Sequence, residues 1–300
     1  MTTYTPAQPR SELRLGPRFN WMNAVLVIIA VGVLGWSLKG TQFSVTTPFE
    51  ASNVKSVVRF VGGLFPPDLS PPFLATLGRL MLETIQISIV GTVLAILSGF
   101  LLAIGAMRRR GEDSSRSSLG TGPWLLRWGS YYASRTILNV LRAVPELVWA
   151  LVFVVAVGLG PFPGVLALAA HSAGVLGKLY AELFESVDQQ LVEAGRSTGA
   201  SDLGVLLCVQ LPAMLPILLS YTLFRWECNM RAATLLGFVG AGGIGSQLTM
   251  SMKLFQYNEV STLAASILIL VILVDVVGQV IRTRILDAPT NACAPVLADA

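Results

Sequence analysis

The sequence predicts an all-α membrane protein with six transmembrane helices, and three observations support that prediction. Hydrophobic residues make up 53% of the 300 positions. Charged residues make up only 13%, against about 25% in an average soluble domain. The apolar positions gather in uncharged runs of roughly twenty residues or more, which is enough to cross a bilayer as a helix. The composition therefore excludes an ordinary water-soluble domain, and also a disordered chain, which needs low hydrophobicity and high charge.

The candidate spans follow from the stretches between charged residues. Four of them run over 19–38, 84–107, 203–224 and 260–281, and the uncharged run 147–177 is divided into two more, the first beginning near 131 and the second ending at about 186. A Gly- and Pro-rich turn signal at 158–164 separates the third span from the fourth, and Pro145 predicts a kink within the third. The first span is longer than the apolar region of a cleaved signal peptide and no small-residue cleavage motif follows it, so we expect a retained anchor.

Basic residues predict the side on which each connecting segment lies. Arginines concentrate in the N-terminal tail and in the segment after the second span, whereas the opposite side carries fewer cations over longer loops. The Arg-rich side should be cytoplasmic, which places both termini in the cytoplasm. The predicted division is a cytoplasmic tail (1–18), an anchor helix (19–38), an extracytoplasmic loop (39–75), a five-helix core (76–285) and a cytoplasmic tail (286–300). Within the loop, the amphipathic stretch 49–65 predicts a helix along the outer surface.

Few residues are suited to catalysis or metal binding. The three cysteines are far apart, there is one histidine, His171, and no metal-site or disulfide spacing is present. The stretch 240–245 fits G-x-G-x-x-G, but the strand and helix of a dinucleotide fold are not predicted around it. We interpret it as an irregular glycine segment closing the outer end of a pore. We expect no catalytic residue, no metal and no cofactor, and the absence of a basic stripe argues against nucleic acid.

The segment between the fourth and fifth spans predicts a helix, a turn and a second helix on the cytoplasmic face. Its first helix should cover 187–198. Spacing predicts one face made of Val187, Leu191, Ala194 and Thr198. Gly199 can take the left-handed conformation that ends a helix, and Ser201 or Asp202 can cap the next one. Composition alone supports two interpretations equally: a helix on the lipid surface, or an element that inserts into another protein.

The spacing in this segment resembles a signature of bacterial ABC-importer permeases, E-A-A-x3-G-x9-I-x-L-P, and favours the second interpretation. The chain has Gly195 in place of the third Ala and Val209 in place of the Ile, and both replacements are small or apolar. The resemblance implies the type I ABC importer permease fold, with a coupling loop at about 187–202 that docks in a groove of a cytoplasmic ATPase. The coupling residues that it implies are Glu193, Ala194, Gly195, Gly199, Ala200, Leu211 and Pro212.

A second stretch resembles the phosphonate-transport branch of that family. It runs from Glu227 through Asn229 and Arg231 to Gly245, and phosphite and hypophosphite permeases share it closely. Segments 65–68 and 142–150 also resemble this branch, so the likeness covers roughly 65–285. It implies a homodimer in a bacterial plasma membrane, with two cytoplasmic ATPase subunits that bind ATP and Mg and one external phosphonate-binding protein. The chain itself would be a non-catalytic membrane subunit without a cofactor.

Ionisable residues within the spans are costly in lipid and usually face the bundle interior or a water path. Helical spacing and opposite charge predict three pairs: Arg142 with Glu146, Glu227 with Arg231, and Arg225 with Asp275 across helices. His171 is expected to pack or to form a hydrogen bond, and Lys178 to pair with Glu182.

Two interpretations of the membrane charges remain open. Either they hold helices together as neutralised pairs, or Arg142, Arg225 or Arg231 presents a cationic surface to a passing oxyanion, because guanidinium groups bind phosphate-like groups through two parallel bonds. The candidate path or gate residues are Arg142, Glu146, Arg225, Glu227, Asn229, Arg231, Gly240, Gly242, Gly243 and Gly245.

The function that these patterns favour is the pore-forming subunit of an ATP-driven importer for phosphonate or a related phosphorus oxyanion. A permease for another small solute, such as phosphite, hypophosphite or methionine, is an alternative. An ion-coupled secondary transporter is a second alternative, but it would predict inverted repeats, and the sequence shows no two halves of equal pattern.

Overall fold

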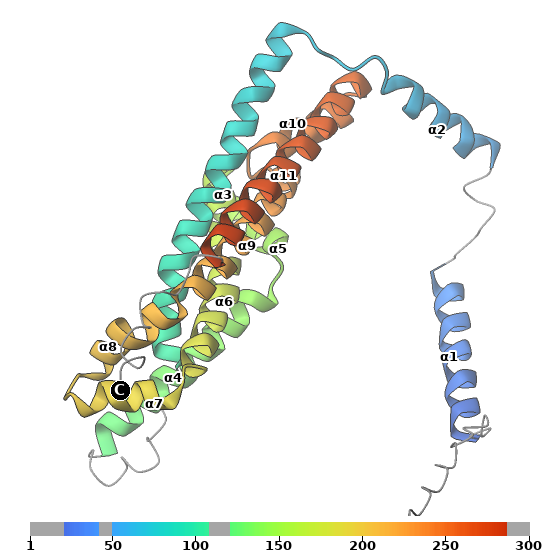
Figure 1. Cartoon of the computed structure of the whole chain (residues 1–300). Coiled ribbons are helices and arrows are strands. Elements are labelled where there is room, and N and C mark those ends of the chain that lie inside the picture. Colours follow the sequence, from blue (N-terminus) through green and yellow to red (C-terminus); the bar gives the residue numbers. More distant parts are fainter. Residues whose placement is uncertain (1–20, 42–49, 108–120, 287–300) are drawn as a thin grey trace, which may run out of the picture. The chain divides into compact units, whose positions relative to one another are not determined.

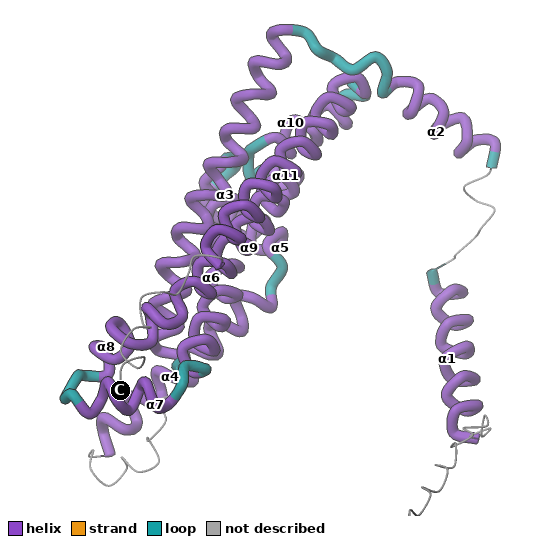
Figure 2. Tube along the Cα trace, in the orientation of Figure 1, coloured by secondary structure: helices purple, strands orange, loops and turns teal. Residues whose placement is uncertain are grey.

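The computed structural model describes residues 21–41, 50–107 and 121–286, and within these residues every regular element is a helix (Figures 1 and 2). The first elements are α1 (Trp21–Gly40), α2 (Ala51–Gly63), α3 (Pro71–Ala106), α4 (Thr121–Ala143), α5 (Glu146–Val157) and α6 (Pro161–Glu185). They are followed by α7 (Gln189–Ser197), α8 (Asp202–Val205), a π-helical turn (Leu206–Gln210), α9 (Leu211–Leu236), a 3-10 turn (Gly237–Val239), α10 (Ile244–Lys253) and α11 (Tyr257–Leu286). The predicted cytoplasmic tails and most of the Arg-rich segment lie outside the described residues.

The chain divides into two compact units, one ending at Arg59 and one beginning at Phe60. The first unit contains the 20-residue α1, in which a stretch of 18 residues has a mean hydropathy of 2.0, and this confirms an apolar helix where the anchor is predicted. It also contains most of α2, which confirms that a helix forms within 49–65.

The second unit is a helical bundle in which α3 and α6 lie side by side (Figure 1). Small residues allow their close approach: a Cβ on Gly99 would lie 3.1 Å from the carbonyl oxygen of Ala173 and 3.1 Å from the amide nitrogen of Gly177. In lipid, where helix association depends on packing, such small residues let two backbones meet. The glycines along α3 and α6 thus bring together the helices that carry much of the buried core.

The described residues contain five helices long and apolar enough to cross a membrane, or six if α4 and α5 count as one span. The prediction of six spans therefore depends on how this pair is counted. The expected kink at Pro145 is a complete break, and the axes of α4 and α5 differ by 94°. Proline lacks the backbone N–H that a continuous helix requires, and its ring collides with the carbonyl four residues earlier.

Several predicted spans are shorter than the helices that contain them, and the differences are largest for α3, α4 and α9. α3 begins at Pro71 rather than at 84, so the predicted boundary between loop and core at 75–76 falls inside this helix. The uncharged run stops at Glu83, but a helix can continue through charged turns: 36 residues extend about 54 Å, beyond an apolar layer of about 30 Å. α9 likewise continues past 224 to Leu236.

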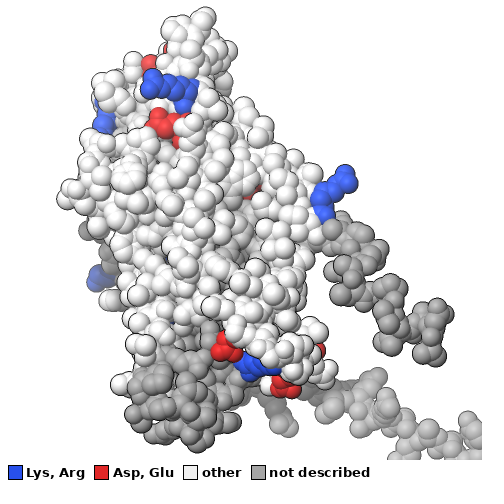
Figure 3. All heavy atoms as spheres, turned by 90° about the vertical axis from the view of Figure 1, so that its left-hand side faces the viewer, with Lys and Arg blue, Asp and Glu red and all other residues white. Residues whose placement is uncertain are grey.

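The charges are distributed as expected for a protein that crosses a bilayer. On the face shown in Figure 3, charged side chains gather near the upper and lower ends of the bundle, and a broad, mostly uncharged area separates them. One end of the bundle carries α7 and α8, and we call it the α7 end. The other carries α10 and the first turns of α3 and α11, and we call it the α10 end (Figure 1).

Candidate functional site

The α7–α8 hairpin, residues 188–205, confirms the predicted helix, turn and helix. α7 starts at a cap that sequence analysis did not single out, in which the Asp188 carboxylate accepts a hydrogen bond from the backbone N–H of Gln190 at 3.0 Å. It ends before Gly199, whose φ of 79° is the expected left-handed conformation. The Ser201 hydroxyl then accepts a hydrogen bond from the Gly204 N–H at 3.2 Å and caps α8.

The hairpin packs on the bundle through a different face from the one that spacing predicts. Leu191, Ala194 and Thr198 are exposed, whereas Val192 and Gly195 are half-buried. A Cβ on Gly195 would lie 3.0 Å from a methyl group of Val209, so the glycine fits against the π-helical turn. Glu193 is exposed and accepts a hydrogen bond from Gln189 at 2.9 Å. Val187 of the predicted face is buried, whereas the rest of that face, the Glu193 side chain and Ala200 are exposed and remain available for a partner.

The π-helical turn joins this hairpin to α9. The Leu211 N–H donates to the carbonyl of Leu206, five residues earlier, rather than four as in an α-helix. Pro212 follows at once, in the first turn of α9, where a proline is tolerated because it lacks an N–H to donate. Leu211 and Pro212 therefore mark the place at which the hairpin passes into a long bundle helix.

The glycine segment lies at the other end of α9 and is held by two bundle elements. Gly240, Gly242 and Gly243 all have positive φ, but Gly245 lies inside α10, so the predicted irregular segment stops at Gly243. Gly245 has a helical backbone and is not needed for its φ angle. It packs against the backbone of Thr234 and Gly237, where a Cβ has no room.

Two residues of α3 that sequence analysis missed fix this segment. Glu83 Oε1 accepts a hydrogen bond from the Gly243 N–H at 2.9 Å, and Thr84 Oγ1 accepts one from the Ile244 N–H at 3.0 Å. The Gly240 carbonyl also accepts a bond from the Gly160 N–H at 3.0 Å, in the turn between α5 and α6. The segment is therefore tied to the bundle at each side.

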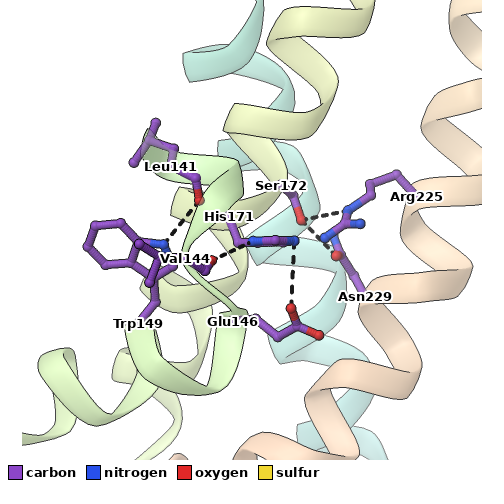
Figure 4. A network of polar contacts seen from close by, with 8 residues as sticks. All are labelled: Leu141, Val144, Glu146, Trp149, His171, Ser172, Arg225 and Asn229. Carbon is purple, nitrogen blue, oxygen red and sulfur yellow. Dashed lines mark hydrogen bonds and ion pairs between the residues drawn. The ribbon is translucent and has the colours of Figure 1, made fainter. Parts of the chain in front are cut away.

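A chain of polar side chains crosses the buried middle of α3, α6 and α9. Arg225 Nε donates to Ser172 Oγ at 3.0 Å, and Ser172 Oγ donates to Asn229 Oδ1 at 2.7 Å (Figure 4). Asn229 Nδ2 in turn donates to Thr92 Oγ1 at 2.9 Å. Ser172 and Asn229 are completely buried. These bonds therefore provide the hydrogen-bond partners that an apolar core or lipid cannot offer to polar side chains. We call these four residues the polar chain.

His171, next to Ser172, holds the break between α4 and α5. Its Nδ1 lies 2.9 Å from the carbonyl oxygen of Val144 and its Nε2 lies 3.6 Å from Glu146 Oε2 (Figure 4). Trp149 Nε1 also spans the break by donating to the Leu141 carbonyl at 3.1 Å. The expected hydrogen-bonding role of His171 is confirmed, and the predicted Lys178–Glu182 pair is present at 3.6 Å.

The three predicted membrane pairs are wrong. Glu146 faces His171, and Arg142 is exposed and donates to Asn139 at 3.3 Å. Each group meets a nearer partner than its i, i+4 neighbour, because the α4–α5 break removes the helical register that the spacing assumed.

The other two pairs fail because the partners lie on other helices. Glu227 is buried and pairs with Arg282 of α11, which leaves Arg231 exposed, 3.8 Å from the Cys228 sulfur. Arg225 bonds Ser172 rather than Asp275, whose Oδ1 is buried without a hydrogen-bond partner.

The structure thus collects the sequence-predicted residues into three places rather than one. Glu193, Ala194, Gly195, Gly199 and Ala200 lie at the hairpin, the glycines at the α10 end, and Glu146, Arg225 and Asn229 in the middle. Arg142 and Arg231 are outside the polar chain, and no group of three metal-ligating side chains occurs among the residues that the structure describes.

Comparison with known proteins identifies the family. The model of a family described as "Binding-protein-dependent transport system inner membrane component" matches residues 118–287, more than half of the chain. The protein belongs to this family. It is therefore a multi-pass inner-membrane permease of an ABC importer, and this family works with ATPase and substrate-binding partners.

Curated relatives include permeases named for phosphite and phosphate. The phosphite transport system permease protein PtxC of Stutzerimonas stutzeri is 36% identical over 280 residues, covering 92% of this chain and 95% of the relative. The phosphate-import permease protein PhnE of Mycolicibacterium smegmatis is 33% identical over 232 residues, covering 77% of this chain and 41% of the relative. The permease is thus similar to phosphite and phosphate permeases, as the sequence resemblance implies.

Solved structures show the fold. A chain of the MetNI methionine ABC transporter, in an inward facing conformation, matches with a TM-score of 0.58 and 20% identity, covering 72% of this chain and 99% of that one. A chain of an amino acid ABC transporter matches with a TM-score of 0.52 and 17% identity, covering 78% and 97%. The permease has the type I ABC importer fold.

Proposed function

We propose that this permease forms the path of an ATP-driven importer for a small phosphorus oxyanion, a phosphonate or phosphite. The observation that carries the proposal is Arg225: its guanidinium is part-buried in the middle of the bundle, where Nε is bonded to Ser172. A fixed arginine whose remaining donors are available suits an oxyanion, because the planar fork matches phosphate geometry. The phosphite and phosphate permeases among the relatives support this substrate class.

The energy would come from separate subunits. In this proposal two cytoplasmic ATPases bind ATP and Mg, grip the exposed face of the α7–α8 hairpin and turn the bundle helices as rigid bodies. The permease performs no covalent chemistry. A second copy completes the path, and one extracytoplasmic phosphonate-binding protein delivers the anion near the glycine segment, which acts as the outer gate. Both termini then lie in the cytoplasm.

Reconstitution tests the substrate. Proteoliposomes containing the permease, its ATPase and its binding protein should take up phosphite, methylphosphonate or phosphate when ATP is supplied, and should not take up methionine. Uptake of methionine but of no phosphorus oxyanion would contradict the assigned substrate class, and uptake driven by an ion gradient without ATP would contradict the importer mechanism.

Photo-crosslinking tests the docking face. A photoreactive side chain at Ala194 or Ala200, both exposed, should attach to the ATPase subunit. The same group at exposed Leu101, on the lipid-facing part of α3, is the control and should attach to lipid. Crosslinks from the hairpin to lipid alone would overturn the docking assignment.

A further inference from the structure

The polar chain has a fixed direction, and this direction fixes Arg225. The Thr92 hydroxyl donates to the Ser88 carbonyl at 2.6 Å and so can only accept from Asn229. The amide of Asn229 therefore offers its oxygen to Ser172, and the Ser172 proton is committed to it. A hydroxyl has one proton to donate, so Ser172 meets Arg225 as an acceptor. The guanidinium is therefore held at its Nε by a series of hydrogen bonds that ends at the Ser88 carbonyl in the α3 backbone.

Most of the donors of Arg225 remain unused. A guanidinium carries five N–H groups, and within the described residues only that of Nε has a hydrogen-bond acceptor. The terminal nitrogens are not among the completely buried polar atoms without partners, so they retain some accessible surface. These donors point to a ligand with ionised oxygens.

Glu146 provides an unused acceptor near the same pair of α6 residues. Its Oε2 lies 3.6 Å from His171 Nε2, which is longer than a hydrogen bond. Its Oε1 has no hydrogen-bond donor within the described residues, and the side chain is 32% exposed. His171 is itself anchored, since its Nδ1 must carry the proton that the Val144 carbonyl accepts. Figure 4 shows Glu146 beside His171 and Arg225 beside Ser172.

A purely structural role would leave these two charges paired with each other. Glu227 and Arg282 form such a structural ion pair. They contact each other directly, and the Glu227 side chain is only 7% exposed. Glu146 and Arg225 instead make no ion pair with each other and both retain hydrogen-bonding capacity. A donor group and an acceptor group left open beside consecutive residues of α6 suit a ligand that offers both an acceptor and a donor.

We propose that Glu146 and Arg225 together select oxyanions that retain one acidic proton. Arg225 donates to the ionised oxygens, and Glu146 accepts the hydrogen bond of the remaining P–OH. Phosphite, phosphonates and phosphate each have an anionic form that carries a P–OH, and this form makes up a substantial fraction of each ion at slightly acid to neutral pH. Sulfate has no such proton, and hypophosphite, although also a monoanion, carries hydrogen on phosphorus and no O–H. An ionised carboxylate only accepts, so it repels both of these ions. This inference rests on the proposed function and makes it specific.

The phosphite–hypophosphite comparison, made at a pH below the second pKa of phosphite, is the sharpest test, because both ions are then monoanions and differ by one hydroxyl. The permease–ATPase complex in nanodiscs, without the binding protein, is titrated with each ion, and line broadening in the phosphorus NMR spectrum reports weak binding. The phosphite signal should broaden about tenfold more than the hypophosphite signal, because only phosphite gives the part-buried Glu146 carboxylate a hydrogen-bond donor. Sulfate should not compete with phosphite. Equal broadening by the two ions would overturn the proposal.

Substitutions assign the two roles. Arg225→Gln should abolish the broadening by phosphite. Glu146→Gln, which can donate as well as accept, should reduce the phosphite-to-hypophosphite ratio to about one and allow sulfate to compete, whereas Glu146→Asp should retain discrimination. Glu182→Gln and Arg79→Gln are matched controls: both residues are exposed and lie outside the polar chain, and their replacement should change nothing.

The outcomes separate this inference from the proposed function. A ratio that stays unchanged in Glu146→Gln, in a complex that still elutes intact with its ATPase, refutes the selection by Glu146 while ATP-driven uptake of phosphorus oxyanions still stands. Absence of that uptake refutes the proposed function, whatever the NMR titrations give.

Discussion

The α7–α8 hairpin and the polar chain are connected by α9 but are stabilised in different ways. The hairpin is exposed, and its stabilising contacts are local: an Asp188 cap, a left-handed Gly199 and a Ser201 cap. The polar chain is buried, and its contacts join residues 53, 57 and 137 positions apart. Local contacts define the shape of the hairpin and leave its outer face free, which suits reversible docking. Long-range contacts hold Arg225 in one orientation, which suits recognition.

Of the substitutions that test this comparison, the largest loss of stability is expected at Asn229, which lies at the centre of the polar chain. Asn229→Leu removes both of its side-chain bonds and leaves the Thr92 and Ser172 hydroxyls without these partners in a dry core. The fold should lose about 1–3 kcal/mol of stability, measured as reversible unfolding in mixed detergent. Asn139→Leu, at an exposed amide of α4, is the matched control and should have little effect. Equal stability of the two variants would show that the polar chain does not hold the bundle.

The second effect concerns the turn of the hairpin. Gly199→Val places a branched side chain at a φ of 79°, which should cost about 1–2 kcal/mol locally. The helices of the bundle should remain folded, while ATP hydrolysis should no longer depend on substrate delivery. Gly199→Asn, a residue that tolerates this conformation, is expected to keep the coupling. Normal coupling in the valine variant would remove the turn from the mechanism.

The smallest effect is expected at the cap of α8. Ser201→Ala removes the acceptor for the Gly204 N–H and should weaken the first turn of α8 by about 1 kcal/mol. Hydrogen exchange at residues 203–205 should accelerate, whereas exchange around Asn229 should not change. Ser197→Ala removes a hydroxyl that only donates to the Ala194 carbonyl and serves as the control. Faster exchange around Asn229 would show that the two regions do not behave independently.

The same contrast explains what the sequence could predict. Gly199 and Ser201 act within a few residues of their partners, so their roles follow from residue type and order. The spacing of Glu227 and Arg231 allows a contact on one helix face, but Arg282 of α11 is the partner that Glu227 meets. Sequence alone carries no signal for such pairing. For the same reason Glu83 and Thr84, 160 positions from the glycine segment that they hold, were not found.

The helix boundaries show a related limit. An uncharged run locates the part of a helix that lipid can cover, and α6 ends at Glu185, next to its predicted end at about 186. It does not report helical turns beyond the lipid, such as the start of α3. Nor does it distinguish a kink from the break at Pro145, which depends on Trp149 and His171 binding the carbonyls on its far side.

His171 and Ser172 are consecutive residues of α6, so their side chains leave the helix about 100° apart. His171 binds the Val144 carbonyl at the α4–α5 break, and Ser172 binds Arg225 of α9. If α6 rotates about its long axis, the α4–α5 break and α9 should both move with it. We therefore expect α5 and α9, on either side of α6, to move together, so that a small rotation of α6 changes the shape of the transport path.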